Sequence, residues 1–314
     1  MKREKISMKT KFGDEEVFGY AWTVEKPVGN IVLVTGMEEY ALRYDDFATF
    51  LCKNNYNVYC LDHYGQGETA GSEDRLGIVP TSFFSKSVKN IDEIVTKCRV
   101  SLLPTTIIAH SMGSFMLQDY IQRFTQHVNK VVFVGTSGPN QKFLFRFGRA
   151  FARLLLNKKN RDKKAHFLNN MLFLKAYGNK IKDRKTQSDW ISLSRDNVDA
   201  YIKDPYCGYV STYGFFYEFM KGLSRIYKKE FLKKIRKDMH VLIIAGDKDP
   251  VGQNGKGPTA LAKLYTKLGL EDVNLSLKNN LRHEILNEEE KQEIYDEILA
   301  FVKKEVEPAE EILK

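Results

Sequence analysis

The chain alternates between two kinds of hydrophobic pattern. Short apolar runs bounded by turn residues are typical of buried strands, whereas longer stretches with apolar positions every three to four residues are typical of amphipathic helices. Strands that alternate with helices favour a mainly parallel sheet with helices on both faces. Strands are predicted at 17–24, 30–35, 56–62, 105–109, 130–135, 240–245 and 272–277. Helices are predicted at 43–54, 82–99, from 112 onward, at 257–268 and at 288–304, the last before a charged tail.

One long segment interrupts this alternation. About a hundred residues separate the strand at 130–135 from the strand at 240–245, where a single crossover helix would be expected. This length is too great for a crossover, and the segment is too apolar for a disordered loop. We therefore predict a core domain made of residues 1–139 and 239–314, with a helical lid subdomain, residues 140–238, inserted into it.

The composition is that of an ordinary globular protein. The chain has 314 residues, of which 43% are hydrophobic and 28% charged, and it has no run of 18 or more apolar residues. The N-terminal stretch MKREKISMKTKFGDEE is basic but has no apolar core, so we expect no signal peptide. The four cysteines have no metal-binding spacing and are interpreted as buried, reduced thiols. These features predict a cytoplasmic protein.

The net charge of +9 is concentrated in the predicted lid. Residues 140–238 carry about fifteen more basic than acidic residues, interleaved with apolar ones. This pattern fits a solvated helix face, a lid that covers an apolar pocket and docks on anionic lipid, or a nucleic-acid surface. No recognised nucleic-acid module accompanies the charge, so nucleic acid is not expected as a partner. The apolar positions at helical spacing are Phe143, Leu144, Phe147, Phe151 and Leu155, and the basic ones beside them are Arg146, Arg149, Arg153, Lys158 and Lys159.

The sequence Ala109-His110-Ser111-Met112-Gly113 lies between the strand at 105–109 and the helix that follows it. It is a near match to the G-x-S-x-G nucleophile elbow, with alanine at the first glycine position. Small residues are needed there because the strained turn around the serine brings a strand and a helix close together. One additional methyl group strains this packing without excluding it. Ser111 is therefore the candidate nucleophile, although a plain strand-to-helix turn can have the same local pattern.

A serine needs two partners to become an effective nucleophile. An imidazole must accept its proton, and a carboxylate must orient that imidazole. In the α/β-hydrolase fold the acid and then the histidine follow the serine, each after a later strand. The loop after the second-last predicted strand contains Asp247 and Asp249, and the loop after the last one contains His283. The order predicts an α/β-hydrolase fold in which Ser111, His283 and one of the two aspartates form a catalytic triad.

The reaction also needs two backbone N–H groups that stabilise a developing oxyanion. One belongs to the residue after the serine, Met112, and the other comes from the loop after an early strand. Gly36-Met37 follows the strand at 30–35, so Met37 is the second predicted donor. The alternative is that this loop is an ordinary strand-to-helix turn.

These motifs resemble those of the α/β-hydrolases of the monoacylglycerol lipase and lysophospholipase type, also labelled serine aminopeptidase-like, and the resemblance spans nearly the whole chain. Thr35 stands where that family usually has histidine before Gly36, and Ala109 stands where it usually has glycine. The motifs that carry the resemblance are Gly36-Met37-Glu38 with Arg43-Tyr44, Asp62-His63-Tyr64-Gly65-Gln66-Gly67, His110-Ser111-Met112-Gly113-Ser114, Trp190-Ile191-Ser192-Leu193-Ser194-Arg195-Asp196 with Asp204-Pro205-Tyr206-Cys207-Gly208, Gly246-Asp247-Lys248-Asp249-Pro250-Val251, and Arg282-His283-Glu284.

The resemblance implies hydrolysis of a carboxylic ester that carries one long acyl chain, such as a monoacylglycerol or a lysophospholipid, through an acyl-enzyme and without a metal or cofactor. It also implies that Asp249, which matches the family's acid, orients His283 in preference to Asp247. A basic lid agrees with peripheral contact with an anionic membrane. Two other classes fit the sequence: an esterase, peptidase or acyltransferase acting on another acyl group, and an inactive binding protein. The sequence leaves the head group, the acyl length and the oligomeric state open.

Overall fold

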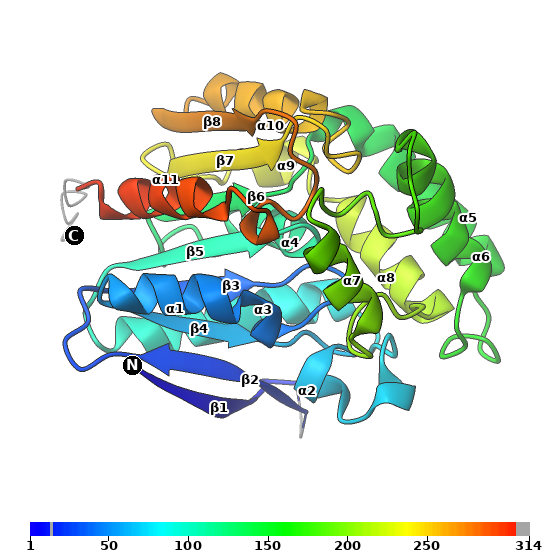
Figure 1. The fold of residues 1–314 in the computed structure, drawn as a ribbon, viewed down its shortest axis with the longest axis horizontal. Helices are drawn as coiled ribbons and strands as arrows, with labels where there is room; N and C mark the ends of the chain where they lie inside the picture. The colour runs from blue at the N-terminus through cyan, green and yellow to red at the C-terminus, as the bar shows by residue number, and fades with distance from the viewer. Residues whose placement is uncertain (13–14, 306–314) are drawn as a thin grey trace.

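An eight-stranded sheet forms the centre of the protein (Figure 1). The computed structural model describes residues 1–12 and 15–305. The strand order is β1-β2-β4-β3-β5-β6-β7-β8, in which β3 to β8 run parallel and β1 and β2 run antiparallel at one edge. The predicted, mainly parallel sheet is confirmed. The strands are β1 Lys2–Lys9, β2 Glu16–Thr23, β3 Gly29–Val34, β4 Tyr56–Leu61, β5 Thr105–His110, β6 Lys130–Val134, β7 His240–Gly246 and β8 Asp272–Lys278.

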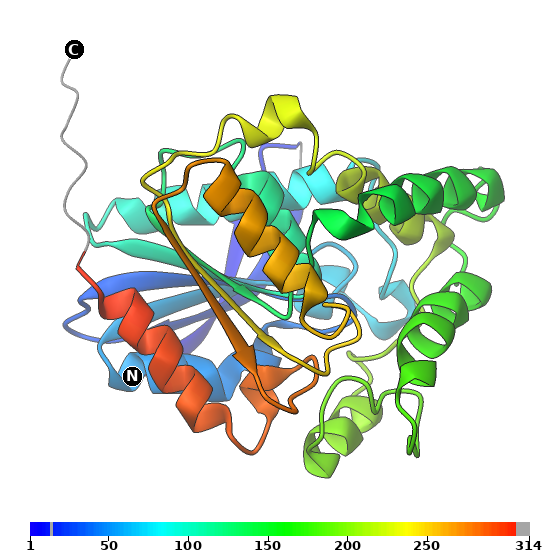
Figure 2. The same ribbon diagram turned by 90° about the horizontal axis from the view of Figure 1, so that it is seen from above.

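Helices cover both faces of the sheet (Figure 2). One face packs against α1 and α11, and the other against α3, α4 and α10. Each of these helices places an apolar stripe against the buried strands. In α3 this stripe includes Phe84, Val88, Ile91 and Val95, which recur every three to four residues. The bounds are α1 Asp45–Lys53, α2 Gly67–Ala70, α3 Phe83–Arg99, α4 Met112–Tyr120, α10 Lys256–Lys267 and α11 Lys291–Lys303, with 3₁₀ turns at Ala41–Tyr44, Glu73–Arg75, Pro139–Gln141 and Ile285–Asn287.

We call residues 140–238, which lie between β6 and β7, the β6–β7 segment. This segment contains its own set of helices. Most of these helices gather beyond the carboxyl ends of the parallel strands, at the right of Figure 1. The segment therefore lies where the loops after β3, β5, β7 and β8 come together, which is the edge at which α/β sheets bind ligands. Its helices are α5 Lys142–Leu155, α6 His166–Asn169, a π-helix at Asn170–Tyr177, a 3₁₀ turn at Gly178–Lys180, α7 Arg195–Lys203, α8 Tyr213–Leu223 and α9 Lys229–Leu232.

Hydrophobic periodicity did not predict every element. Strand β1 was missed because it is an edge strand, and among its eight residues only Met8 is buried. The helix predicted at 43–54 begins with a 3₁₀ turn before α1, and the helix predicted at 288–304 is α11, which starts at Lys291. The charged tail predicted after it falls mostly on residues 306–314, which lie outside the described residues.

All four cysteines are buried and free of disulfides. Within residues 1–12 and 15–305, none of the helices has the length and apolar character needed to cross a membrane.

Candidate active site

Ser111 lies at the sharp turn between β5 and α4. Its φ of 50° and ψ of −117° are strained for a residue that has a side chain. Gly113 permits the turn, because a Cβ atom at this position would lie 2.6 Å from the carbonyl oxygens of Val34 and Thr35 on the neighbouring strand. The methyl group of Ala109 is fully buried in the same region. The backbone therefore has the strand–turn–helix geometry of a nucleophile elbow.

The structure brings Ser111, His283 and Asp249 together from three separate loops. The hydroxyl oxygen of Ser111 lies 2.8 Å from Nε2 of His283, and Nδ1 of His283 lies 2.9 Å from Oδ2 of Asp249. The other carboxylate oxygen of Asp249 accepts a hydrogen bond of 2.8 Å from the N–H of Val251. Both His283 and Asp249 are almost completely buried. This arrangement can pass a proton from a serine hydroxyl to an imidazole whose tautomer is fixed by a carboxylate.

Asp247, the alternative acid, occupies a different position. Its Oδ1 accepts a 2.8 Å hydrogen bond from the N–H of Asn280, and its other oxygen lies 3.7 Å from the ammonium of Lys248. It therefore joins the loops that follow β7 and β8. The structure places Asp249 beside His283 and Asp247 at the outer side of the loop.

The predicted oxyanion donors flank the same serine. Met37 belongs to the loop after β3, and Met112 is the first residue of α4. The β3 loop passes directly beside the nucleophile, because a Cβ atom on Gly36 would lie 3.0 Å from Cβ of Ser111. Met37 and Met112 both line the pocket into which Ser111 opens. The two backbone N–H groups thus belong to residues on either side of the serine.

Behind the serine lies a buried carboxylate, Glu39. Its Oε1 accepts hydrogen bonds from the N–H of Gly36, from the hydroxyl of Tyr44 at 2.7 Å and from Nδ1 of His110 at 2.9 Å. Burial by itself would raise the pKa of Glu39, but the nearby His110, with further help from Arg43 and Tyr44, outweighs burial and lowers it. Burial would lower the pKa of His110, but Glu39 outweighs it and raises that pKa. The two side chains therefore form a buried ion pair.

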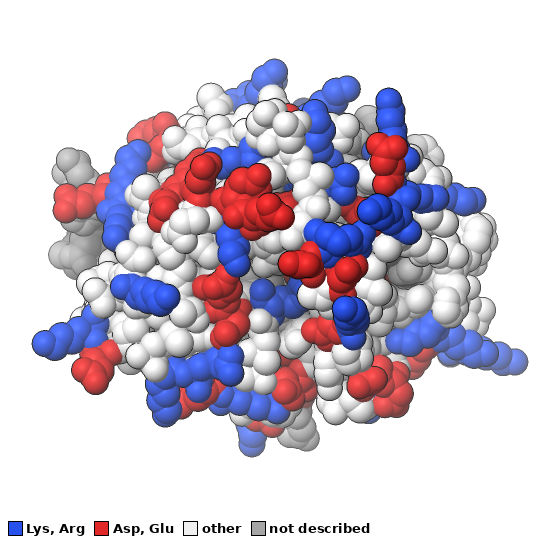
Figure 3. Space-filling view, viewed as in Figure 1, with Lys and Arg blue, Asp and Glu red and all other residues white. Residues whose placement is uncertain are grey.

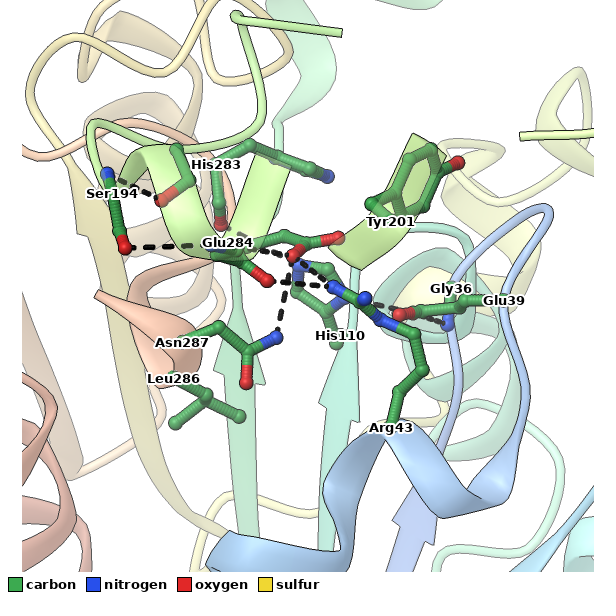
Figure 4. A network of polar contacts seen from close by, with 12 residues as sticks. Gly36, Glu39, Arg43, His110, Ser194, Tyr201, His283, Glu284, Leu286 and Asn287 are labelled. Atoms are coloured by element: carbon green, nitrogen blue, oxygen red, sulfur yellow. Dashed lines mark hydrogen bonds and ion pairs between the residues drawn. The ribbon is translucent and has the colours of Figure 1, made fainter. Parts of the chain in front are cut away.

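A second buried ion pair joins the histidine loop to the 3₁₀ turn before α1, and hydrogen bonds extend from this pair to the β6–β7 segment (Figure 4). The guanidinium of Arg43 contacts the carboxylate of Glu284, the residue after His283, and donates to the side-chain oxygen of Asn197 at 3.0 Å. The amide of Asn197 donates to the same carboxylate at 2.8 Å, and the Arg43 guanidinium lies over the ring of Tyr201. Both charged side chains are less than a tenth exposed. Through Asn197 and Tyr201, this pair connects the loop of His283 with α7.

Sequence reasoning assigned no role to Glu39, Arg43 or Tyr44. Arg43 and Tyr44 appeared there only in the motifs of the family resemblance. For Glu39 a signal was available, because it is a charged residue two positions after Met37, outside the helix predicted at 43–54. His110 was treated only as a constrained part of the elbow, although its imidazole pairs with Glu39.

The serine opens into a pocket that is lined largely by apolar side chains. The ring of Trp190 lies 5.2 Å from the ring of His283, so the β6–β7 segment covers the imidazole directly. The core contributes Met37, Ser111, Met112, Phe115, Val251 and His283, and the β6–β7 segment contributes Leu144, Phe145, Leu172, Phe173, Tyr177, Trp190, Ile191, Tyr201, Phe219, Met220 and Leu223.

Hydrogen bonds fasten the β6–β7 segment to the histidine loop. The guanidinium of Arg282 donates to the carbonyl oxygens of Asp189 at 2.5 Å and Ser192 at 3.0 Å. The carboxylate of Glu288 accepts from the hydroxyl of Ser192 at 2.8 Å and from the N–H of Leu193 at 2.9 Å. This part of the segment is therefore fixed relative to the site.

Glu38 fastens the segment to the oxyanion loop. Its carboxyl group is buried and hydrogen-bonded to the hydroxyl of Ser211 at 2.8 Å, and its carbonyl oxygen accepts from the N–H of Gly208 at 3.1 Å. Burial raises the pKa of Glu38 to about 8, although Ser211 and the ammonium of Lys164 act in the opposite direction. Glu38 is thus a neutral acid at pH 7, immediately after Met37.

Helix α5 exposes most of its aromatic residues. Phe145 and Ala152 are buried, whereas the side chains of Phe147 and Leu154 are 73% and 81% exposed. The prediction grouped Leu155 with Phe143, Leu144, Phe147 and Phe151, but Leu155 packs on the core, and Leu154 is exposed with the others. The reason is the way α5 packs: its face with the small residues Gly148 and Ala152 lies against α8. The exposed apolar residues of α5 and its surroundings are Phe143, Leu144, Phe147, Phe151, Leu154, Phe167 and Met171.

Within residues 1–12 and 15–305, no group of three or more His, Cys, Asp or Glu side chains is placed so that it could hold a metal ion.

Comparison with known proteins identifies relatives along nearly the whole chain. The family described as serine aminopeptidase, S33 matches residues 25–290. The monoacylglycerol lipase of Mycolicibacterium smegmatis is 24% identical over 283 residues, 90% of each chain. A probable lysophospholipase L2 of Haemophilus influenzae is 25% identical over 276 residues, 83% of this chain and 78% of the relative. The structure of a thermostable carboxyl esterase from Bacillus coagulans superimposes with a TM-score of 0.84 at 25% identity, covering 96% of this chain and 98% of the other. The predicted α/β-hydrolase fold and the family resemblance are confirmed.

Proposed function

The chain belongs to the serine aminopeptidase S33 family, and on that premise we propose that it hydrolyses carboxylic esters of lipids with a single acyl chain. In this proposal Ser111 is the nucleophile, His283 its base and Asp249 the acid that orients the base. The observation that carries it is the hydrogen-bonded series from Asp249 through His283 to Ser111, which opens onto an apolar pocket.

The reaction proceeds through an acyl-enzyme. The hydroxyl of Ser111 attacks the ester carbonyl while Nε2 of His283 takes its proton, and Asp249 stabilises the imidazolium. The N–H groups of Met37 and Met112 stabilise the oxyanion of the tetrahedral intermediate. His283 then protonates the leaving alcohol. Water, activated by the same histidine, releases the fatty acid and restores Ser111.

The pocket supports a long acyl chain as the substrate's main recognition element. Most of its lining is aliphatic and aromatic, and the polar residues that line it are Glu39, His110, Ser111, Gln141, His283 and Glu284. The names of two relatives, a monoacylglycerol lipase and a probable lysophospholipase, suggest the two candidate head groups, glycerol and glycerophosphate. In both kinds of substrate, a single acyl chain is esterified to the head group and would enter the pocket.

The β6–β7 segment acts in this proposal as a lid. It supplies most of the aromatic wall of the pocket, including Phe173 and Trp190, so its position decides whether an acyl chain can enter. On the exposed apolar face of α5, Leu144 also lines the pocket, and Phe143 and Phe147 are 59% and 73% exposed.

We further assign to the lid a docking role on anionic membranes. Arg146, Arg149 and Arg153 follow the exposed aromatic residues along α5 and form no ion pair in the described part of the chain. Figure 3 shows uncharged surface at its right edge, where α5 and α6 lie, with Lys and Arg side chains above and below it. A helix with apolar and basic faces of this kind binds in the interface of an anionic bilayer. Docking there would place the pocket entrance next to the substrate.

A chain-length series tests the proposal. Monoacylglycerols and lysophospholipids with acyl chains from about four to 18 carbons are assayed with and without anionic vesicles. We expect kcat/KM to rise with chain length and to rise further on anionic vesicles. A preference for the shortest esters, with no gain on vesicles, would favour a small-ester esterase. Turnover of aminoacyl substrates alone would favour a peptidase, and no turnover of any substrate would favour an inactive binding protein.

A further inference from the structure

Gly36 is held at both of its backbone polar groups. Its N–H donates to the carboxylate of Glu39, and its carbonyl oxygen accepts a 2.8 Å hydrogen bond from the side-chain amide of Gln66. Both partners are buried, with Gln66 only 1% exposed. A backbone without a side chain is required here, because a Cβ atom would lie 2.4 Å from the carboxylate of Glu39. Hydrogen bonds therefore hold the two peptide groups on either side of Gly36.

The hydrogen bond from Gln66 determines the direction of another group. The carbonyl of Gly36 and the N–H of Met37 belong to one planar trans peptide, so they point in opposite directions. When the carbonyl is fixed toward Gln66, the N–H of Met37 is fixed toward the other side of the loop. That N–H is the proposed oxyanion donor contributed by this loop.

Gln66 is itself rigidly placed by the loop after β4. Oδ1 of Asp62 accepts a 2.7 Å hydrogen bond from the N–H of Ala41, and Oδ2 accepts one of 2.8 Å from the N–H of Glu68. Gly67 has a φ of +42°, and a Cβ there would lie 2.2 Å from Asp62. One carboxylate thus joins the loop that carries Gln66 to the chain that follows the oxyanion loop.

Glu39 fastens the other side of Gly36 to the nucleophile elbow. Its carboxylate also accepts from Nδ1 of His110, the residue that directly precedes Ser111. The β3 loop and the serine are therefore connected through one carboxylate. A change in the position of the serine turn would move the β3 loop with it.

From this geometry we propose that Gln66 is a positioning residue, which orients the Met37 N–H toward the oxyanion of ester hydrolysis. Glu39 completes the clamp by holding the other end of Gly36 against the elbow. Gln66 does not touch the substrate and acts only through the peptide that it fixes. The inference rests on the proposed function, and it assigns a role to the Asp62–Gly67 motif, which the triad itself does not explain.

Gln66→Met tests it, because methionine keeps the length of the side chain and removes the amide donor. Gln122→Met is the matched control, since Gln122 is equally buried and its amide donates to two carbonyl oxygens, those of Gln118 and Ile226, outside the site. Complete loss of an oxyanion donor lowers kcat by about 10²–10³. For a misdirected donor we expect a fall in kcat of about 10–100-fold, with KM within about threefold of the wild-type value.

Two further readouts separate positioning from a general loss of structure. Affinity for an alkyl boronic acid, which forms a tetrahedral serine adduct, should fall by about the same factor as kcat. Affinity for a non-hydrolysable ether analogue of the substrate should stay unchanged. Gln66→Asn, in which the amide is one methylene shorter, should give an intermediate loss and serves if the methionine variant does not fold.

The outcomes distinguish this inference from the proposed function. If the wild-type protein hydrolyses esters and Gln66→Met matches Gln122→Met in kcat and boronate affinity, the positioning role is wrong and the proposed function stands. A rise in KM with unchanged kcat would also overturn it. If the wild-type protein hydrolyses no ester, the proposed function fails, and the rate of phosphonylation by a fluorophosphonate decides the positioning role. Equal phosphonylation rates in the two variants would then overturn it.

Discussion

The two walls of the pocket are stabilised in different ways. On the core side, charged groups are buried and paired, as with Glu39 and His110 or Arg43 and Glu284, each less than a tenth exposed. On the α5 side, aromatic side chains are exposed, and the arginines between them form no ion pairs within residues 1–12 and 15–305. Burying charge is costly unless partners are fixed, so the core wall maintains one geometry. The α5 wall is suited instead to contact with another surface, and substrate access is the function that such a surface would control.

The strongest test of the core wall is the acid of the triad. Asp249→Asn keeps the shape of the side chain but no longer fixes the His283 tautomer, and we expect kcat to fall by about 10⁴-fold. Ser111→Ala and His283→Ala should each cost more, and the double variant should cost no more than either alone because the triad acts as a unit. Steady-state kinetics on a long-chain monoacylglycerol provides the measurement.

Asp247→Asn is the matched control for that experiment, since Asp247 lies two residues away and bonds to the backbone of Asn280. It should leave kcat within a few-fold of wild type. A greater loss in Asp247→Asn than in Asp249→Asn, with both proteins folded, would reverse the assignment.

The second prediction concerns the buried ion pair between Arg43 and Glu284, to which Asn197 of α7 is hydrogen-bonded. Arg43→Met leaves the buried carboxylate of Glu284 without its cation, and we expect the free energy of unfolding to fall by about 3–5 kcal/mol. Lys291→Met breaks the exposed pair with Asp46 and should cost at most about 1 kcal/mol. Urea unfolding curves give both values. Equal losses in the two variants would mean that burial does not distinguish the pairs.

The third prediction uses pH at the junction between the β3 loop and the β6–β7 segment. The folded pKa of Glu38, about 8, lies above its ordinary value near 4.5, so the folded state retains the proton longer than the unfolded state. Its contribution to stability is fully present below about pH 4.5 and is lost as the pH rises through about 8.

Glu38→Gln keeps the hydrogen bond to Ser211 and removes the titration. Relative to this variant, wild type should lose up to about 4 kcal/mol of unfolding free energy between pH 5 and pH 9. Urea unfolding of both proteins at several pH values gives the difference. If the two proteins depend on pH in parallel, Glu38 does not titrate in this range.

The smallest expected effects on stability lie on α5. Reversing Arg146, Arg149 and Arg153 to glutamate should change the unfolding free energy by less than about 0.5 kcal/mol, because the side chains are exposed and unpaired. Binding to anionic vesicles should weaken at least tenfold, since each basic residue near such a surface contributes roughly 1 kcal/mol. Co-sedimentation with anionic and neutral vesicles, with and without salt, measures it.

In the matched control, Lys256, Lys263 and Lys267 on α10 are replaced by glutamate. These lysines are exposed, and their replacement gives the same change in net charge. Its vesicle binding should stay near the wild-type level. Equal weakening by both triple variants would indicate a general charge effect, and binding to neutral vesicles as well would exclude an electrostatic role for α5.

Sequence order predicted the α/β architecture because buried parallel strands are continuous apolar runs, and β3, β5 and β7 are such runs. It also grouped Ser111, His283 and one of Asp247 and Asp249, since strand ends in this fold meet at one edge, and the family resemblance selected Asp249. Local pattern could not reveal the pairing of Glu39 with His110, which lie 71 residues apart and meet only in the folded chain. It could not show which of Leu154 and Leu155 faces outward, because that depends on how α5 packs on α8.

The central claim, that Ser111 is the nucleophile of this hydrolase, is tested most directly by mapping the site of covalent modification. Wild-type protein is treated with a long-chain fluorophosphonate, digested and analysed by mass spectrometry. We predict one adduct, on the peptide that contains Ser111, and none on folded Ser111→Ala under the same conditions. An adduct on another residue, or the same extent of labelling in folded Ser111→Ala, would contradict the claim.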